Sequence, residues 1–256
     1  IVLPLLDIKR INERLDLVQH FITETDMRNV LTQHIRQCGD IERLVSKIPL
    51  KKINPRELQH IARGLQHIAQ IRQIGLTTGN DYLHRMADAL NPCQYIMEKI
   101  LREIRENPPV QPSKGGVIAD GIHAELDELR RISTGGKNYL VELQQKEAEI
   151  TGPAEWIRKQ TLANAERYIT PELKEYEEKI MGAEDKIIRI ELELYDKLLL
   201  ELADYIAPMQ VNGNTLAIID CLCCFAQNAL QFQYRRPNLH DGTKMEVSNG
   251  RHPVIE

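Results

Sequence analysis

One short stretch of this 256-residue chain gathers side chains of the types that bind phosphate groups. Arginine, lysine and the amide and hydroxyl side chains donate the hydrogen bonds that proteins use toward phosphate oxygens. The segment after it, residues 172–193, holds eight acidic residues against four basic ones, and such a segment repels a polyanion. We therefore predict that a nucleic acid would meet the first stretch and not the second, although side chains that simply close a helical hairpin would give the same pattern. The stretch contains Trp156, Arg158, Lys159, Gln160, Thr161, Asn164, Arg167 and Tyr168.

A second segment, residues 133–138, has some residues of a phosphate loop but not its pattern. Its sequence is Ser-Thr-Gly-Gly-Lys-Asn. A phosphate loop needs GxxxxGK and then Ser or Thr, between a strand and a helix, so that backbone N–H groups and the lysine surround the phosphates. Here Asn138 follows the lysine, the first glycine is missing and the surrounding pattern is helical. We therefore expect no nucleotide site, and we expect the glycine pair to let two helices approach closely or to bend one of them.

Cysteine and histidine show no metal site by local spacing. Cys221, Cys223 and Cys224 lie close together, but no second Cys or His pair stands at a ligand spacing, so we expect free thiols buried in a helix core. His60 and His67 are seven residues apart, too far for the i, i+4 geometry of one shared ion, and solvated or capping roles are expected for both. No Ser/His/Asp set or paired carboxylates can be identified, so we predict that this chain is not itself an enzyme.

The composition is typical of a helix-rich protein in a reducing compartment. Hydrophobic residues make up 42%, charged residues 27% and aromatic residues 5% of the chain, which suits charged amphipathic helices. The net charge of −4 confines any nucleic-acid contact to a local surface. Five cysteines without a framework spacing favour reduced thiols and a cytoplasmic location. No apolar run approaches the length of a membrane span and no signal peptide opens the chain, so no membrane partner is expected.

Helical periodicity dominates the first half of the sequence. Asn54, Pro55 and Glu57 form a strong helix start, with a capping Asn, a proline at the first helical position and Glu at the third. We predict a bundle of helices with short connections, broken by residues 107–113 and followed by a turn and short strand over 114–121. The predicted helices, with their caps, cover residues 7–22, 25–38, 40–49, 54–75, 81–90 and 92–106.

Two long helices are predicted to form an arm. The second, residues 172–205, contains no proline and one glycine, and at 1.5 Å per residue it would be about 50 Å long. The first, residues 122–150, has nearly the same apolar rhythm and is its natural antiparallel partner. After the arm we predict a turn at residues 212–214 and a buried helix over 215–234, with loop and strand beyond. The seam of the second helix follows a 4-3-4-3-4 spacing at Tyr176, Ile180, Ala183, Ile187, Ile190 and Leu194.

Five strings of the sequence resemble the MutS family of DNA mismatch repair proteins. They occur in the family's order and cover nearly the whole chain. The strings that contain NAERYITPELKEYE and KGGVI with ELDELR are each specific, and together they are strong. The strings are Leu5–Val18, Cys38–Leu44, Pro108–Arg130, Arg158–Ile180 and Asn249–Glu256.

The resemblance implies an all-α fold: a helical bundle core with a long antiparallel two-helix arm and the remnant of a small β clamp at the arm tip. The family normally has some two dozen further residues between Gly152 and Pro153. We favour residues missing from the numbered sequence over a true deletion, because Trp156 and Ile157 have the character of a returning strand. The implied parts are the first part of the core (lever) domain, the outgoing arm helix, the remainder of the clamp, the returning arm helix with core closure, and the start of a truncated ATPase domain. Their ranges are 1–120, 121–152, 153–168, 169–240 and 241–256.

The same resemblance implies a lever and clamp fragment that contacts the DNA backbone non-specifically and links DNA binding to an ATPase domain outside this chain. The fragment would hold no cofactor or metal, whereas the complete protein would be a DNA-dependent ATPase that binds ATP and Mg²⁺. Its partners would be double-stranded DNA, a second copy in a homodimer and other mismatch repair proteins. A mismatch-reading domain is expected before Ile1 and the ATPase domain after Glu256, with His252 near its start. The residues carried over as backbone contacts are Arg158, Lys159, Gln160, Thr161, Asn164 and Arg167.

Two other functions stay open at this point. A helical scaffold would use the arm tip to bind another protein. A paralogue would use the same helical core in recombination or in work associated with the ribosome.

Overall fold

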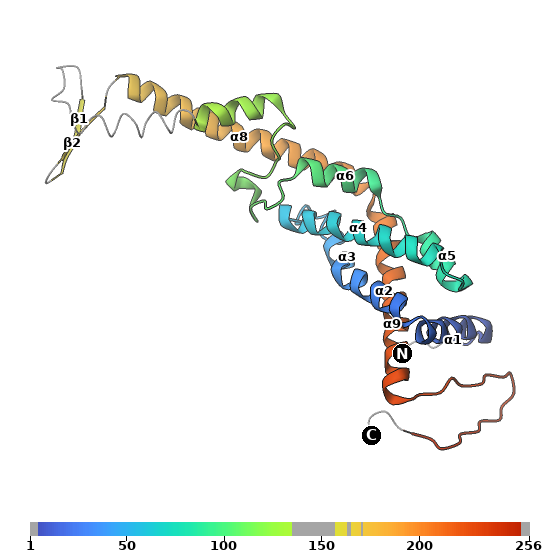
Figure 1. Cartoon of the computed structure of the whole chain (residues 1–256). Coiled ribbons are helices and arrows are strands. Elements are labelled where there is room, and N and C mark those ends of the chain that lie inside the picture. Colours follow the sequence, from blue (N-terminus) through green and yellow to red (C-terminus); the bar gives the residue numbers. More distant parts are fainter. Residues whose placement is uncertain (1–4, 135–156, 163–164, 170, 252–256) are drawn as a thin grey trace.

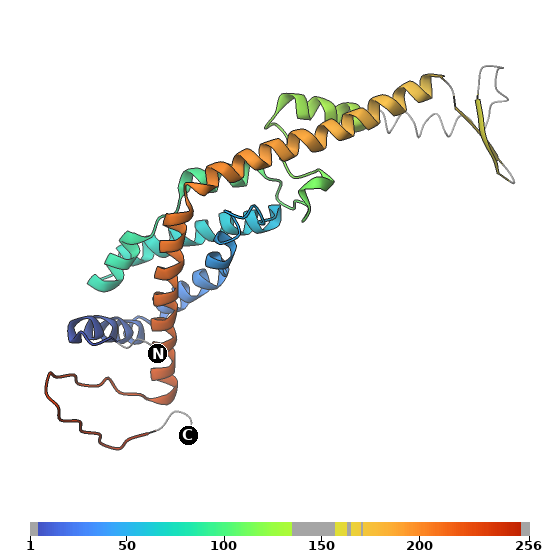
Figure 2. The same ribbon diagram turned by 180° about the vertical axis from the view of Figure 1, so that it is seen from behind.

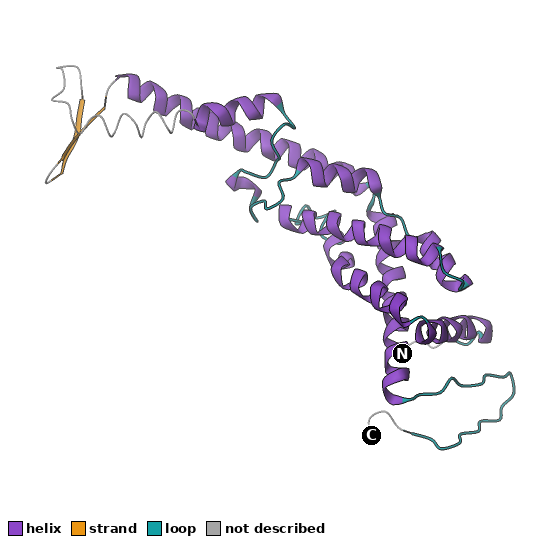
Figure 3. Cartoon of the chain, viewed as in Figure 1, coloured by secondary structure: helices purple, strands orange, loops and turns teal. Residues whose placement is uncertain are grey.

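The computed structural model describes residues 5–134, 157–162, 165–169 and 171–251. A long arm projects from a core of shorter helices and carries two strands at its far end (Figure 1). The described part is helical apart from these strands and the connecting loops (Figure 3). This arrangement confirms the predicted all-α core with an arm and a small β element at its tip.

The first and third helices begin at the capping residues that the sequence predicts, although the third ends at Val45, short of the predicted residue 49. The side chain of Asp7 accepts hydrogen bonds from two backbone N–H groups of the first helix, and Asp40 accepts one from the third. Such caps satisfy N–H groups that have no partner inside the helix. Gly39 ends the second helix with φ of 63°, and a Cβ atom there would lie 2.5 Å from the ring of His60. The helices are α1 (Ile8–Thr23), α2 (Thr25–Cys38) and α3 (Ile41–Val45).

The central helix of the core is α4 (Pro55–Leu76), and it starts at the capping box that the sequence predicts. The Asn54 side chain accepts from the Glu57 N–H at 3.0 Å, and the Glu57 carboxylate accepts from the Asn54 N–H at 3.1 Å. Helices α2, α5 (Asp81–Ala89) and α6 (Gln94–Glu103) pack against α4. Its buried residues therefore face neighbours on several sides, which makes it the core's main scaffold.

The predicted short strand over residues 114–121 is reduced to one isolated bridge between Ile104 and Ile118. A 3₁₀ turn, η1 (Pro112–Lys114), precedes it, and the chain then becomes helical again over residues 124–134. The rest of the predicted outgoing helix, including the glycine pair, lies outside the described residues. In the described part this helix runs antiparallel to the returning arm, because Ser133 contacts Glu184 whereas Arg130 contacts Glu191.

The returning arm is a single helix, α8 (Pro171–Ala203), which runs from the strands into the core (Figure 2). Its predicted seam is confirmed where side chains are described, since Ile180, Ala183 and Ile190 are buried and Ile187 and Leu194 are partly buried. Toward the core, more residues of the helix are buried, and they pack against the hydrophobic core of the bundle. They are Tyr195, Leu198, Leu199 and Leu202.

The predicted turn at residues 212–214 is wrong, because helix α9 (Ile206–Phe232) runs through it without a break. Asn212 is fully buried, and its side-chain amide donates to the carbonyl of Asn91 at 2.6 Å while its oxygen accepts from the Asn91 N–H at 2.8 Å. Helix α9 passes close to α3 at Gly213, where a Cβ would lie 3.6 Å from Glu42, an ordinary contact distance. Tertiary contacts therefore override the turn preference of the Asn-Gly-Asn sequence.

Helix α9 qualifies the expectation that no segment reaches the length of a membrane span. By length and composition alone it is the single helix among the described residues that could cross a membrane. It packs against α1, α2, α3 and α5 and buries the polar residues Asn212 and Thr215. A core helix of a globular protein passes the same test, but only 33% of the apolar window of α9 is buried, so this packing accounts for part of its apolar composition.

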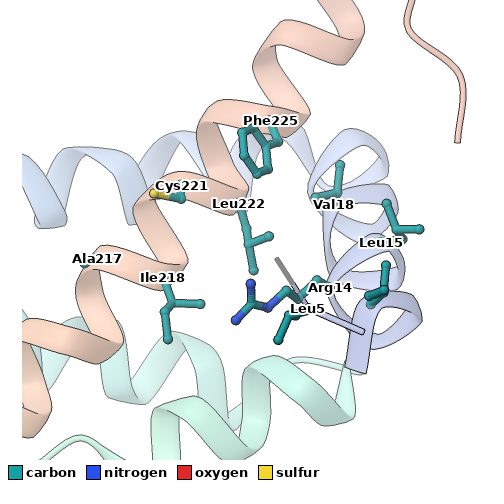
Figure 4. A pocket seen from close by; sticks show the side chains of 10 residues that line it. Leu5, Arg14, Leu15, Val18, Ala217, Ile218, Cys221, Leu222 and Phe225 are labelled. Atoms are coloured by element: carbon teal, nitrogen blue, oxygen red, sulfur yellow. The ribbon is translucent and has the colours of Figure 1, made fainter. Parts of the chain in front are cut away.

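The cysteines of α9 correct one prediction. Cys223 is buried, and burial raises the pKa of its thiol to about 12, but Cys221 and Cys224 are exposed. Cys221 lines an apolar groove of about 420 Å³ between α1 and α9, in which Arg14 is the one charged residue (Figure 4). The other lining residues are Leu5, Ile11, Leu15, Val18, Ala217, Ile218, Leu222 and Phe225.

Candidate nucleic-acid interface and the base of the arm

The predicted phosphate-binding stretch forms a β-hairpin at the far end of the arm. Strand β1 (Ile157–Leu162) pairs antiparallel with β2 (Ala165–Ile169). In this register Arg158 lies opposite Tyr168 and Gln160 opposite Arg167. The register shifts between Arg158 and Gln160, so Lys159 occupies a bulge.

The structure thus gathers most of the predicted contact residues on one small element. Arg158, Lys159, Gln160 and Thr161 belong to β1, and Arg167 belongs to β2. Asn164 and Trp156 lie outside the described residues. The hairpin places the main chain of the two strands side by side, and the assignment of these residues as DNA contacts stays a prediction.

Helix α8 determines how far this hairpin stands from the core. Its 33 residues correspond to about 50 Å at 1.5 Å per residue. Along the described part of the shaft, Asp185, Lys186 and Arg189 are exposed, while Glu184 accepts a hydrogen bond from Ser133 at 3.4 Å. The interpretation of Glu184 and Asp185 as a fully solvated face is therefore correct only for Asp185. Glu177 and Glu178 lie where side chains are not described.

A buried ion pair joins the two arm helices at their base. Glu191 of α8 is 1% exposed, and its carboxylate lies 2.5 Å from the guanidinium of Arg130 on the outgoing helix. The other oxygen of Glu191 accepts from the backbone N–H of Val117 at 2.8 Å. Both carboxylate oxygens are thus satisfied, which is what allows a charge to remain buried.

Arg130 also fastens the loop that leaves the core. Its guanidinium donates to the carbonyl of Ile118 at 2.7 Å and to the carboxylate of Asp120 at 2.6 Å. Arg105 reaches the same two groups, at 3.1 Å and 2.8 Å. The loop, the outgoing helix and α8 therefore share one hydrogen-bonded network, with Arg130 at its centre.

Two further contacts attach α8 to the bundle. The hydroxyl of Tyr195 donates to the carbonyl of Ile53 at 2.9 Å, and burial, with smaller contributions from nearby carboxylates, raises the pKa of this hydroxyl. Lys99 of α6 hydrogen-bonds both carboxylate oxygens of Glu201, at 2.5 and 2.6 Å, and this contact raises the pKa of Lys99. The core end of α8 is thus held by polar contacts as well as by its apolar seam.

Sequence reasoning missed this network because its members come from distant parts of the chain. Arg130 and Glu191 are 61 positions apart, and Tyr195 and Ile53 are 142 apart. One signal was available: Glu191 stands four residues after Ile187 and four before Tyr195, so it is an acid on an apolar helix stripe. An acid in that position needs a buried partner.

A helical core that extends a long arm with a β-hairpin at its tip defines the class of domain. The family model of MutS domain III matches residues 1–226, and this chain belongs to the MutS family of DNA mismatch repair proteins. The DNA mismatch repair protein MutS of Phocaeicola vulgatus is 45% identical over 282 residues, covering 100% of this chain and 32% of that protein. The proteins of the same name from Bacteroides thetaiotaomicron and Flavobacterium johnsoniae are 43% and 40% identical, with 33% and 32% of their lengths covered. The chain spans about a third of the length of these relatives.

The alignment length bears on the further residues that the resemblance implies between Gly152 and Pro153. The alignment to the Phocaeicola protein spans 282 positions although this chain has 256 residues, so 26 positions of that relative have no counterpart here. This number agrees with the two dozen extra residues that the resemblance implies. Their location at Gly152–Pro153, which lies outside the described residues, stays a prediction, as do the domain boundaries.

Proposed function

We propose that this chain is the lever and part of the clamp of a DNA mismatch recognition protein. One observation carries the proposal: the stretch richest in phosphate-binding residues forms a hairpin at the far end of α8, whose other end is fixed in the core. A family of DNA mismatch repair proteins provides the context. The names of the relatives favour a mismatch repair protein over the paralogue alternative.

The hairpin is suited to hold the DNA backbone rather than to read bases. Contacts to phosphate oxygens position a protein on DNA and carry no sequence information. Residues 158–161 provide two cations, an amide and a hydroxyl in succession, and the acidic shaft behind them disfavours DNA along its length. The hairpin is therefore the part of this chain that would approach a duplex.

The base of the arm is the part that would transmit the contact. Arg130, Glu191 and Tyr195 fix α8 to the loop and to the bundle, so a displacement of the tip is passed to the core rather than lost in a flexible joint. In this proposal the chain performs no catalysis. ATP and Mg²⁺ are bound by an ATPase domain elsewhere in a cytoplasmic homodimer, which acts on double-stranded DNA with other mismatch repair proteins.

The tip is tested by reversing two of its charges in the longest natural form of the protein. Arg158→Glu with Lys159→Glu is expected to weaken binding of a mismatched duplex about tenfold or more, because a hydrogen bond to a charged group contributes about 1.5–3 kcal/mol. The slope of log K against log salt should decrease by about two, since each phosphate contact contributes about 0.9. Fluorescence anisotropy over a salt series measures both, and the response of ATP hydrolysis to DNA should shift to higher DNA concentration.

The matched control changes the same charge on the shaft. Lys186 and Arg189 are exposed on α8, so Lys186→Glu with Arg189→Glu alters the net charge equally without touching the tip. This variant should keep the salt slope of the unchanged protein. Equal affinities and slopes for tip variant and unchanged protein would refute the DNA assignment and favour the scaffold function.

A further inference from the structure

Two half-buried histidines from neighbouring helices face each other. His34 of α2 and His67 of α4 have their Nδ1 atoms 3.0 Å apart, and their ring centroids are 5.3 Å apart. Both side chains are half-buried, so solvent and small ions reach them. The sequence expectation for His67, a solvated or capping role, missed this partner ring, whereas His60 is exposed as expected.

The chemistry of the pair leaves a nitrogen lone pair available. In a neutral imidazole one ring nitrogen donates and the other accepts, so at this distance one Nδ1 donates and the other offers its lone pair. Neutral imidazole is the form that binds metal ions, and an ion can replace the shared proton.

The spacing also fits one metal ion. Two nitrogens bound to the same ion at about 2.0–2.1 Å, at angles between square and tetrahedral, lie about 2.9–3.4 Å apart. The observed 3.0 Å falls in this interval. We propose that His34 and His67 form a binding site for a divalent transition metal ion of the kind that imidazole prefers, Zn²⁺, Ni²⁺ or Cu²⁺.

The remaining ligands of this ion would be water. The described residues contain no group of three or more His, Cys, Asp or Glu side chains placed to hold an ion. A site with two protein ligands exchanges its metal with solvent and differs from a closed structural zinc site. Its effect would be mechanical, because the ion would link α2 to α4, two helices that pack against each other.

Zinc titration followed by calorimetry tests the site, in the longest natural form of the protein. A Cys221→Ser/Cys224→Ser background removes the exposed thiols, which also bind zinc. One Zn²⁺ per chain should bind to the pair, and His34→Asn and His67→Asn should each weaken that event at least about tenfold. Zn²⁺ should also raise the unfolding midpoint by a few degrees, reversibly with EDTA, because a ligand of the folded state stabilises it.

His60→Asn is the matched control, since His60 lies on the same helix as His67 and its side chain is exposed. It should leave the zinc event unchanged. An affinity that stays the same in both His34→Asn and His67→Asn, or that falls equally in His60→Asn, would overturn the proposal. Circular dichroism shows that each variant is folded, and His67→Gln replaces His67→Asn if the latter is not.

Discussion

The two ends of α8 are held in different ways. At the core end, a carboxylate, a hydroxyl and a second carboxylate each meet a partner on another element, and two of these contacts are buried. At the tip end, two strands of five or six residues pair with each other through the main chain. The core end depends on contacts between residues far apart in the sequence, whereas the tip depends on a local hairpin and its composition.

Because the two ends are held differently, substitutions at the base and at the tip should affect different properties. Substitutions at the base should change the free energy of unfolding, because they leave buried polar groups without partners. Charge changes at the tip should change DNA affinity and leave stability nearly unaltered. The proposed lever role requires this division, because the base of the arm would have to stay in place while the tip is displaced.

Loss of Arg130 is expected to have the largest effect. Arg130→Met leaves the carboxylate of Glu191, which is 1% exposed, without its cation, and such a loss costs about 3–5 kcal/mol. Adding Glu191→Gln removes the uncompensated charge and keeps an oxygen for the Val117 N–H, so the double variant should be more stable than Arg130→Met alone. Urea unfolding of the three proteins measures the difference.

Arg131 provides the control for this prediction. It follows Arg130 on the same helix, but its side chain is 78% exposed and pairs with Glu128, whose side chain is 52% exposed. Arg131→Met should leave the urea midpoint unchanged, because exposed ion pairs contribute little. If Arg130→Met lowers the midpoint no more than Arg131→Met does, the buried pair of Arg130 and Glu191 does not stabilise the base of the arm.

The sequence predicted features that depend on neighbouring residues better than features that depend on distant contacts. Asp7, Asp40 and the Asn54 capping box mark helix starts by local chemistry, and the structure confirms each of them. The turn at residues 212–214 failed because the partner of Asn212 is Asn91, 121 positions away. No local pattern contains such a contact, so α9 could not be recognised as continuous.

The same limit applies to the candidate site. The local composition was enough to predict that the hydrogen-bond donors of the arm tip lie close together. The strands show that residues 158–161 and 167 share one hairpin. The base network and the His34–His67 pair each join two helices that are distant in sequence. Their members carry ordinary local signals, and only the packing of the helices brings them together.

An intermediate effect is expected at Tyr195. Tyr195→Phe removes the donor to the Ile53 carbonyl and leaves a buried acceptor unpaired, which costs about 1–3 kcal/mol. Tyr95→Phe on α6 is the matched change, because the Tyr95 side chain is exposed. Differential scanning calorimetry should show a lower unfolding midpoint for the first variant only. Equal midpoints would mean that the apolar seam alone attaches α8 to the bundle.

The smallest effect, and the one that depends on pH, is expected at Glu57 beside the base. Burial acts to raise the pKa of Glu57, but the hydrogen bonds from the Lys47 ammonium and the Asn54 N–H outweigh it, and the pKa lies below its ordinary value of 4.5. A carboxylate with a lowered pKa stabilises the folded state above its unfolded pKa, and this stabilisation is lost as the pH falls through the folded pKa. Glu57→Gln keeps the capping oxygen and removes only the charge, so it should cost at most about 1 kcal/mol at neutral pH. Urea unfolding at a series of pH values should show the two proteins converging as the pH drops below 4.5. A difference that stays constant down to the lowest pH would show that the capping geometry, and not the charge paired with Lys47, stabilises this end of α4.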